Sequence, residues 1–224
     1  MLRRMSGKRR PVIAIAALAL LALAGYWGYA EQQQRSQQAA VAAALTDTTT
    51  RLRDSLAVAP NATGRRALPR IDGHFAAVEG YLKTVRGAKS VPELADGAEH
   101  YVLGAREILR RQAASIRQSE QSAASRAALI RHMRRAARRD AGWIREAMAQ
   151  KKNVEAQYFD YGLTLKALAE LLRTFPGSKT RLAPHDAAQA LHDDAPAAEA
   201  RTLVLKEARR VADELASVRR LAPR

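Results

Sequence analysis

The stretch VEAQYFDYGLTLKALAELLRTF, residues 154–175, carries the clearest repeat in this chain of 224 residues. Its apolar side chains recur every three or four positions, at Val154, Tyr158, Tyr161, Leu165, Leu168, Leu172 and Phe175. Because a helix turns once in about 3.6 residues, this spacing lines one face of a helix. A narrow apolar stripe of this kind packs against other helices, as in a bundle or coiled coil.

Similar stripes predict helices over most of the remaining chain. In chain order, the predicted helices are one that ends near residues 59–64, a turn by composition, one through residues 71–85, one from Ser90 to about residue 108, a long region over about 122–175 and one over about 197–221. A break in the long region is left open near Gly142 or at residues 151–153. Ser90 and Glu93 have the spacing of a capping box, in which each side chain bonds a free backbone N–H at a helix start.

The fold class follows from these stripes, because no stretch shows the sustained alternation of a strand. We predict an all-α protein in which one N-terminal transmembrane helix precedes an antiparallel bundle. That bundle should contain about four to five main helices with coiled-coil-like packing.

The predicted transmembrane helix is the uncharged segment PVIAIAALALLALAGYWGYA, residues 11–30. A helix of this length spans about 30 Å, which matches the hydrocarbon core of a membrane. Five basic residues precede the segment and few follow it, so the Lys and Arg bias predicts a cytoplasmic N-terminus. Tyr26, Trp27 and Tyr29 lie at the far end, where aromatic rings favour the interface between membrane and water.

Three parts follow: a basic cytoplasmic tip (1–10), a transmembrane signal-anchor (11–30) and an extracytoplasmic helical bundle (31–224). The alternative is a signal peptide cleaved after Ala30, which leaves a soluble periplasmic protein, since residues 28–30 form a small–x–small pattern. The excess of Ala and Arg over Lys is typical of a GC-rich bacterium. We therefore expect the anchor in the bacterial inner membrane and the body in the periplasm.

Positive charge is distributed unevenly along the chain, whose net charge is +16. Residues 106–152 hold 13 basic and 4 acidic side chains, a net charge of +9. On one continuous helix, the segment LIRHMRRAARRDAGWIR (129–145) would turn its arginines to one side of an apolar stripe. Guanidinium groups bind phosphate or carboxylate through paired hydrogen bonds. The candidate residues for binding an anion or a partner are Arg131, Arg134, Arg135, Arg138, Arg139, Arg145 and Trp143.

We expect no enzymatic activity, no cofactor and no metal site. The chain has no cysteine, no Gly-rich phosphate loop and no catalytic motif. One acidic–imidazole cluster exists, at His185, Asp186, His192, Asp193 and Asp194. On a helix its two histidines would lie about 10.5 Å apart along the axis, too far for one zinc ion.

The predicted function is that of a noncatalytic interaction or scaffold protein of the cell envelope, with an envelope protein as its partner. The alternative is binding of anionic lipid or envelope polymer through a basic helix face within residues 106–152. Nucleic acid is not expected as a partner on the extracytoplasmic side. Self-association into a homo-oligomer is left open.

Overall fold

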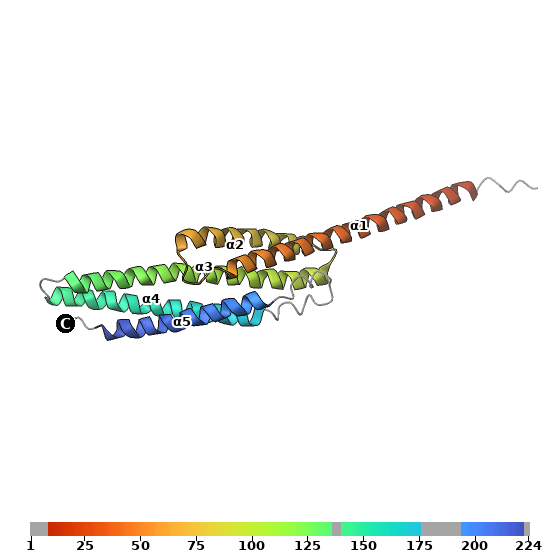
Figure 1. The fold of residues 1–224 in the computed structure, drawn as a ribbon. Coiled ribbons are helices and arrows are strands. Elements are labelled where there is room, and N and C mark those ends of the chain that lie inside the picture. The colour runs from red at the N-terminus through yellow and green to blue at the C-terminus, as the bar shows by residue number, and fades with distance from the viewer. Residues whose placement is uncertain (1–8, 136–139, 176–193, 222–224) are drawn as a thin grey trace, which may run out of the picture.

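The computed structural model describes the backbone of residues 9–135, 140–175 and 194–221, and within these ranges the side chains from residue 25 onward, except that of Arg135. Across these ranges the chain forms five helices and no strand. They are α1 (Arg9–Leu56), α2 (Gly64–Gly87), α3 (Pro92–Arg135), α4 (Ala141–Thr174) and α5 (Ala195–Arg220). The helices pack side by side into an elongated bundle, which confirms the all-α prediction (Figure 1).

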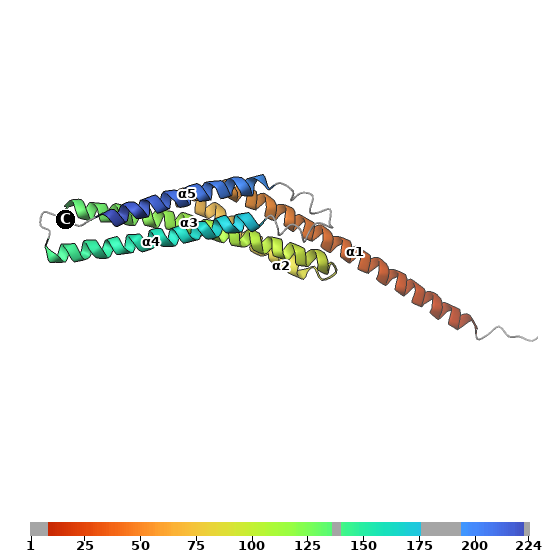
Figure 2. The ribbon, with the colours of Figure 1, turned by 90° about the horizontal axis from the view of Figure 1, so that it is seen from below.

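The long helix α3 lies in the middle of this bundle. It packs against α1 and α2 and also against α4, and α5 completes the bundle by packing on α4. Both views show the end of α3, the start of α4 and the end of α5 together at one end of the bundle (Figures 1 and 2). The first half of α1 extends away from the opposite end.

The core consists of the apolar stripes that the sequence predicts. All seven residues of the stripe over 154–175 are buried, and Tyr161 and Leu165 are completely so. The stripe of α2 is buried at Ile71 and Val78, and that of α5 at Val211. Full burial of one large apolar side chain stabilises a fold by about 1.5–3 kcal/mol, so these seams hold the helices together.

The start and length of α3 differ from the prediction. The helix runs without a break from Pro92 to Arg135, whereas the stripes suggested one helix near residues 90–108 and a separate region from about residue 122. It begins two residues after Ser90, at a proline, which suits a first helical position because that position needs no N–H group. The backbone N–H of Ser90 donates instead to Gln37 Oε1 of α1, at 2.7 Å.

The predicted continuous basic face over residues 129–145 is wrong. α3 ends at Arg135 and α4 begins at Ala141, so these residues belong to two helices. Asp140 is the N-cap of α4, where its Oδ1 atom accepts a hydrogen bond of 2.8 Å from the N–H of Trp143. An aspartate cap satisfies a backbone donor that would otherwise be free at a helix start. The break lies close to Gly142, one of the two positions that the sequence leaves open.

The predicted membrane span falls mostly outside the side chains that the structure describes. Within the described residues, no helix combines the length and apolar character that crossing a membrane requires. The side chains of residues 11–24 and all of residues 1–8 lie outside the described residues. The span therefore stays a prediction, as does the cytoplasmic tip.

Candidate functional site

The basic segment 106–152 divides into two parts with different surroundings. In the first part, residues 106–126, the arginines of α3 form ion pairs with acids of α2, α3 and α5. The pairs are Arg106–Glu79, Arg110–Glu107, Arg111–Glu107, Arg117–Asp72 and Arg126–Glu214. Surface pairs of this kind stabilise a fold by about 0.2–1 kcal/mol each, so this charge supports the packing of α3 against its neighbours.

In the second part, residues 131–152, Lys151 is half-buried, but other cations whose side chains the structure describes are exposed near one end of the bundle. Arg131, Arg134 and Arg145 form no ion pair with any other residue that the structure describes. Lys152 is also exposed, as are the last two residues of α5. We call the following six residues the basic end: Arg131, Arg134, Arg145, Lys152, Arg219 and Arg220.

The candidate residues predicted from sequence lie partly at this end and partly outside the described residues. Arg131, Arg134, Arg145 and Trp143 lie at this end, on α3 and α4 rather than on one helix face. Arg135 is the last residue of α3, and its side chain is not described. The remaining two candidates, Arg138 and Arg139, lie outside the described residues.

Sequence reasoning missed the contribution of α5 to the basic end. Arg219 and Arg220 join it because α5 packs along α4. Lys151 of α4 fixes this arrangement, since its ammonium group donates to the backbone oxygens of Arg219 and Leu221, at 2.7 and 2.8 Å. These are carbonyls at a helix C-terminus, which have no partner within their own helix. No local pattern could have revealed a contact between residues so far apart in the sequence.

Trp143 packs the start of α4 against the end of α3. Its ring stacks on that of His132, with centroids 5.6 Å apart and an angle of 9° between the planes. The Nδ1 atom of His132 lies 3.8 Å from Glu146 Oε1. Trp143 is half-buried as a result, so the cations, more than this ring, are presented to solvent.

Apolar side chains are interleaved with the cations at the start of α4. Ile144 is exposed and Met148 is 59% exposed. Residues four apart lie above one another on a helix, so Ile144, Met148 and Lys152 form a row. An open hollow of about 410 Å³ lies along this row, lined by Met148, Ala149, Lys151, Lys152 and Glu155. This face of α4 therefore offers both positive charge and apolar surface.

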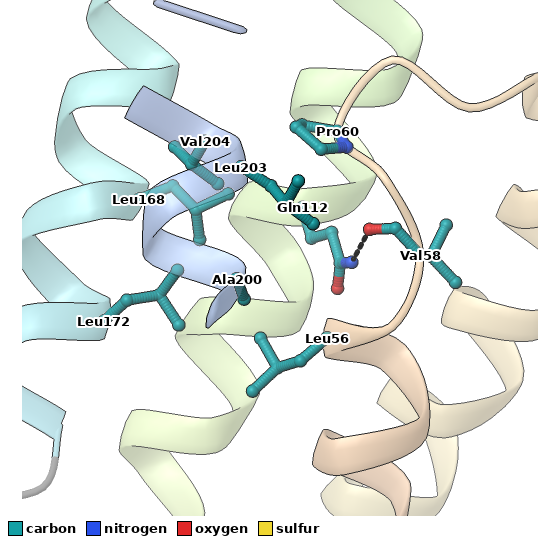
Figure 3. A pocket seen from close by; sticks show the side chains of 9 residues that line it. All are labelled: Leu56, Val58, Pro60, Gln112, Leu168, Leu172, Ala200, Leu203 and Val204. Atoms are coloured by element: carbon teal, nitrogen blue, oxygen red, sulfur yellow. Dashed lines mark hydrogen bonds between the residues drawn. The ribbon is translucent and has the colours of Figure 1, made fainter. Parts of the chain in front are cut away.

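A small cavity lies where α1, α3, α4 and α5 meet (Figure 3). Its volume of about 10 Å³ holds one water molecule at most, and ligand pockets measure about 300–1,000 Å³. Gln112 at its wall donates to the backbone oxygens of Ser55 and Val58, at 2.6 and 3.1 Å, and accepts from the Ser55 hydroxyl. The first carbonyl lies in the last turn of α1 and the second just beyond it, so the glutamine caps the end of that helix.

A buried polar cluster joins α4, α5 and the connection between α1 and α2. Glu207, only 5% exposed, accepts from the Tyr161 hydroxyl at 3.0 Å and from Asn61 at 3.1 Å. Arg210 donates to both carboxylate oxygens, at 2.6 and 2.9 Å. Burial raises the pKa of Tyr161, which keeps its hydroxyl protonated as a donor. The carboxylate is thus surrounded by donors, which is what a buried charge requires for stability.

The described residues contain no group of three or more His, Cys, Asp or Glu side chains that could hold a metal ion. Of the acidic–imidazole cluster in the sequence, His185, Asp186, His192 and Asp193 lie outside the described residues. No protein-family model, curated protein or solved structure matches the chain. The function is therefore inferred from the chain's own residues.

Proposed function

We propose that the protein is a single-pass membrane protein of the bacterial cell envelope that holds a helical bundle outside the cytoplasm. There it acts as a noncatalytic interaction or scaffold protein. The observation that carries this proposal is α1, a continuous helix of 48 residues that contains the apolar segment and ends inside the bundle at Leu56. Such a helix couples a membrane anchor rigidly to the domain that it carries.

The aromatic residues of α1 support an anchor at this point. Tyr26, Trp27 and Tyr29 lie beyond the bundle, and Trp27 is 71% exposed. Rings with an apolar body and a polar tip are stabilised at the boundary between membrane and water. They form the far end of the apolar segment, which is where the outer boundary of a span would lie.

The next part of α1 has the character of a spacer. Residues 31–38, EQQQRSQQ, are polar on every side, and an ion pair of 2.6 Å joins Arg35 to Glu31. A helix that is polar all round bridges between two bodies through solvent. It also lacks the apolar positions of a coiled-coil seam. This supports a single stalk between membrane and bundle, rather than a stalk paired with a second copy.

An exposed apolar pair on α4 supports a protein partner for the bundle. Phe159 is 53% exposed, and Leu163, one helical turn further on, is also exposed. Aromatic and large apolar side chains at the surface are typical of contact sites between proteins. This pair lies on the solvent side of a helix whose other face is already buried in the core.

Topology is the first test of the proposal. A C-terminal fusion to alkaline phosphatase, which is active only outside the cytoplasm, should be active, and the chain should resist carbonate extraction from membranes. Intact mass should show that residues 1–30 are retained. A matched variant with Leu20→Arg and Leu21→Arg should lose membrane retention, because charge at the centre of a span costs about 2.5–3.5 kcal/mol per residue. Activity of a C-terminal reporter that works only in the cytosol would contradict the proposal.

The partner is tested by site-specific photo-crosslinking in the native membrane. A crosslinking residue at position 159 should give a discrete adduct, and the yield should fall severalfold when Leu163 is changed to Ser. The same residue at position 76, an exposed alanine of α2, is the control and should give none. Absence of any adduct at position 159 would contradict the protein-partner part of the proposal.

A further inference from the structure

Among the described residues, no acid forms an ion pair with the six cations of the basic end, and Glu155, which lies beside Lys152 in the hollow, pairs with Lys151 at 3.9 Å. Asp140 caps α4 through Trp143, and Glu146 faces His132 at 3.8 Å. Glu214 forms its closest ion pair with Arg126, at 3.1 Å. Clustered cations repel one another, so this end of the bundle should favour an anionic neighbour.

The basic end also lies far from the predicted anchor. α3 has 44 residues, which corresponds to about 66 Å of helix. The bundle begins where Gln37 of α1 meets Ser90, and the aromatic residues of α1 lie further out, on a stalk that adds about 15 Å. The basic end is therefore on the order of 80 Å from the boundary of the anchoring membrane. Charges interact in physiological salt over only about 8 Å, so that membrane does not attract this end of an upright bundle.

From this arrangement we propose that the basic end binds an anionic phospholipid surface that faces the anchoring membrane, so that the protein bridges two membranes. The inference rests on the proposed function, because it needs α1 as the anchor. It goes beyond that function by naming what binds to the end of the bundle that lies farthest from the anchor.

The apolar residues among the cations favour a lipid surface over a soluble polymer. Lys and Arg attract anionic head groups, and neighbouring apolar side chains enter the boundary between head groups and acyl chains. Ile144 and Met148 stand exposed beside Arg145 and Lys152 on the first turns of α4. A polymer that carries only charge would leave this apolar surface in water.

The test reconstitutes the full chain into large neutral phosphatidylcholine vesicles. Flotation after carbonate treatment measures insertion, and protease access to the C-terminal helices identifies the outward-facing fraction. Small fluorescent vesicles are then added, either neutral or with about 30% phosphatidylglycerol. The fluorescence that sediments with the large vesicles measures bridging. We expect capture of the anionic vesicles on the order of a hundredfold above that of neutral ones, with strong loss between about 0.05 and 0.5 M NaCl.

Two charge variants locate the binding surface. The first removes four cations of the basic end: Arg131→Gln, Arg134→Gln, Arg145→Gln and Lys152→Gln. The control removes four exposed cations of α2 and of the turn that follows it: Arg65→Gln, Arg66→Gln, Lys83→Gln and Lys89→Gln. Both have the same net charge. We expect the first to lose capture and the control to retain it, and equal capture by the two would overturn the proposal.

A third variant, Ile144→Ser with Met148→Ser, distinguishes binding to a lipid surface from binding to a charged polymer. We expect it to lose capture severalfold while the salt dependence persists. If it captures anionic vesicles as well as the unchanged chain does, the end recognises charge alone and the lipid proposal is overturned. If phosphatidylglycerol in the anchoring vesicles abolishes capture, the end reaches its own membrane and bridging is overturned.

Failure of the inference can be told apart from failure of the proposed function. A chain that inserts, exposes its bundle and captures no anionic vesicle overturns the bridging inference alone. A chain that does not insert overturns both.

Discussion

The middle of α3 and the basic end carry similar side chains in different surroundings. Arg106 and Arg117 in the middle face acids of α2, whereas Arg131 and Arg134 stand where the bundle has no acid to pair with them among the described residues. The first two arginines help to pack α3 against α2. The second pair is exposed for contact with another molecule. Charge density along a sequence therefore does not locate a binding surface until the packing partners of each cation are known.

The largest difference between the two regions should appear in their apolar side chains. We expect Leu165→Ala, in the middle of α4, to lower the free energy of unfolding by about 2–5 kcal/mol, because it leaves a cavity. Met148→Ala at the basic end should change it by less than about 0.5 kcal/mol, because that side chain is already exposed. Urea unfolding of the full chain in neutral detergent, followed by circular dichroism, measures both. Equal losses would mean that Met148 is covered in solution.

The next effect concerns Gln112, whose side chain caps the C-terminal end of α1 in the middle of the bundle. Gln112→Leu should lower the free energy of unfolding by about 1–3 kcal/mol, because the Ser55 and Val58 carbonyls lose their donor. The same urea titration measures this loss. Gln150→Leu on α4 is a matched control, since its amide bonds only an exposed carboxylate one turn away. A loss as large in the control would show that the hydrogen bonds from Gln112 to the Ser55 and Val58 carbonyls do not account for the effect.

How far sequence alone leads can be judged from the same two regions. The apolar period of 154–175 predicted the buried face of α4 correctly, because that pattern depends only on helical geometry. The end of α1 was predicted near residues 59–64 from turn composition, and the helix ends close by, at Leu56. The bond from Gln112 to α1 could not be predicted, since it joins residues more than fifty positions apart.

The basic end was predicted less well from the sequence. The arginines of 129–145 were found from their density, yet their arrangement was wrong because the helix was extended through Asp140. Asp followed by small residues is an N-cap signal that the sequence contained. The contribution of α5 to the basic end depends on tertiary packing. The pairing of residues 106–126 with acids of other helices does so too. Neither could be derived from local pattern.

A smaller effect on stability should distinguish cations that have an acidic partner from cations that have none among the described residues. We expect Arg117→Gln to lower the free energy of unfolding by about 0.2–1 kcal/mol, because it removes two hydrogen bonds to Asp72, of 3.0 and 3.1 Å. Arg131→Gln should leave it unchanged or raise it slightly, because repulsion among the cations falls. Urea titrations at low and high salt measure both, and the difference should shrink as salt rises. A loss from Arg131→Gln would indicate a partner within the bundle.

The smallest effect is a pH dependence that belongs to the middle of α3. Hydrogen bonds from Arg110 and Arg111 lower the pKa of Glu107 from its ordinary value of 4.5 to about 2. The unfolded chain therefore takes up a proton at higher pH than the folded chain does. The stabilisation is complete above pH 4.5 and is lost as the pH falls toward 2.

Urea midpoints of the full chain across this pH range test the effect. In Glu107→Gln, stability should fall less steeply between pH 4.5 and 2 than in the unchanged chain, and Arg110→Gln should weaken the slope in the same direction. Arg134→Gln at the basic end should leave the slope in place, because this arginine has no carboxylate partner among the described residues. A slope that depends on Arg134 as strongly as on Arg110 would show that the two regions share one electrostatic network, which would remove the distinction between the cations that hold the bundle together and those free to bind a surface.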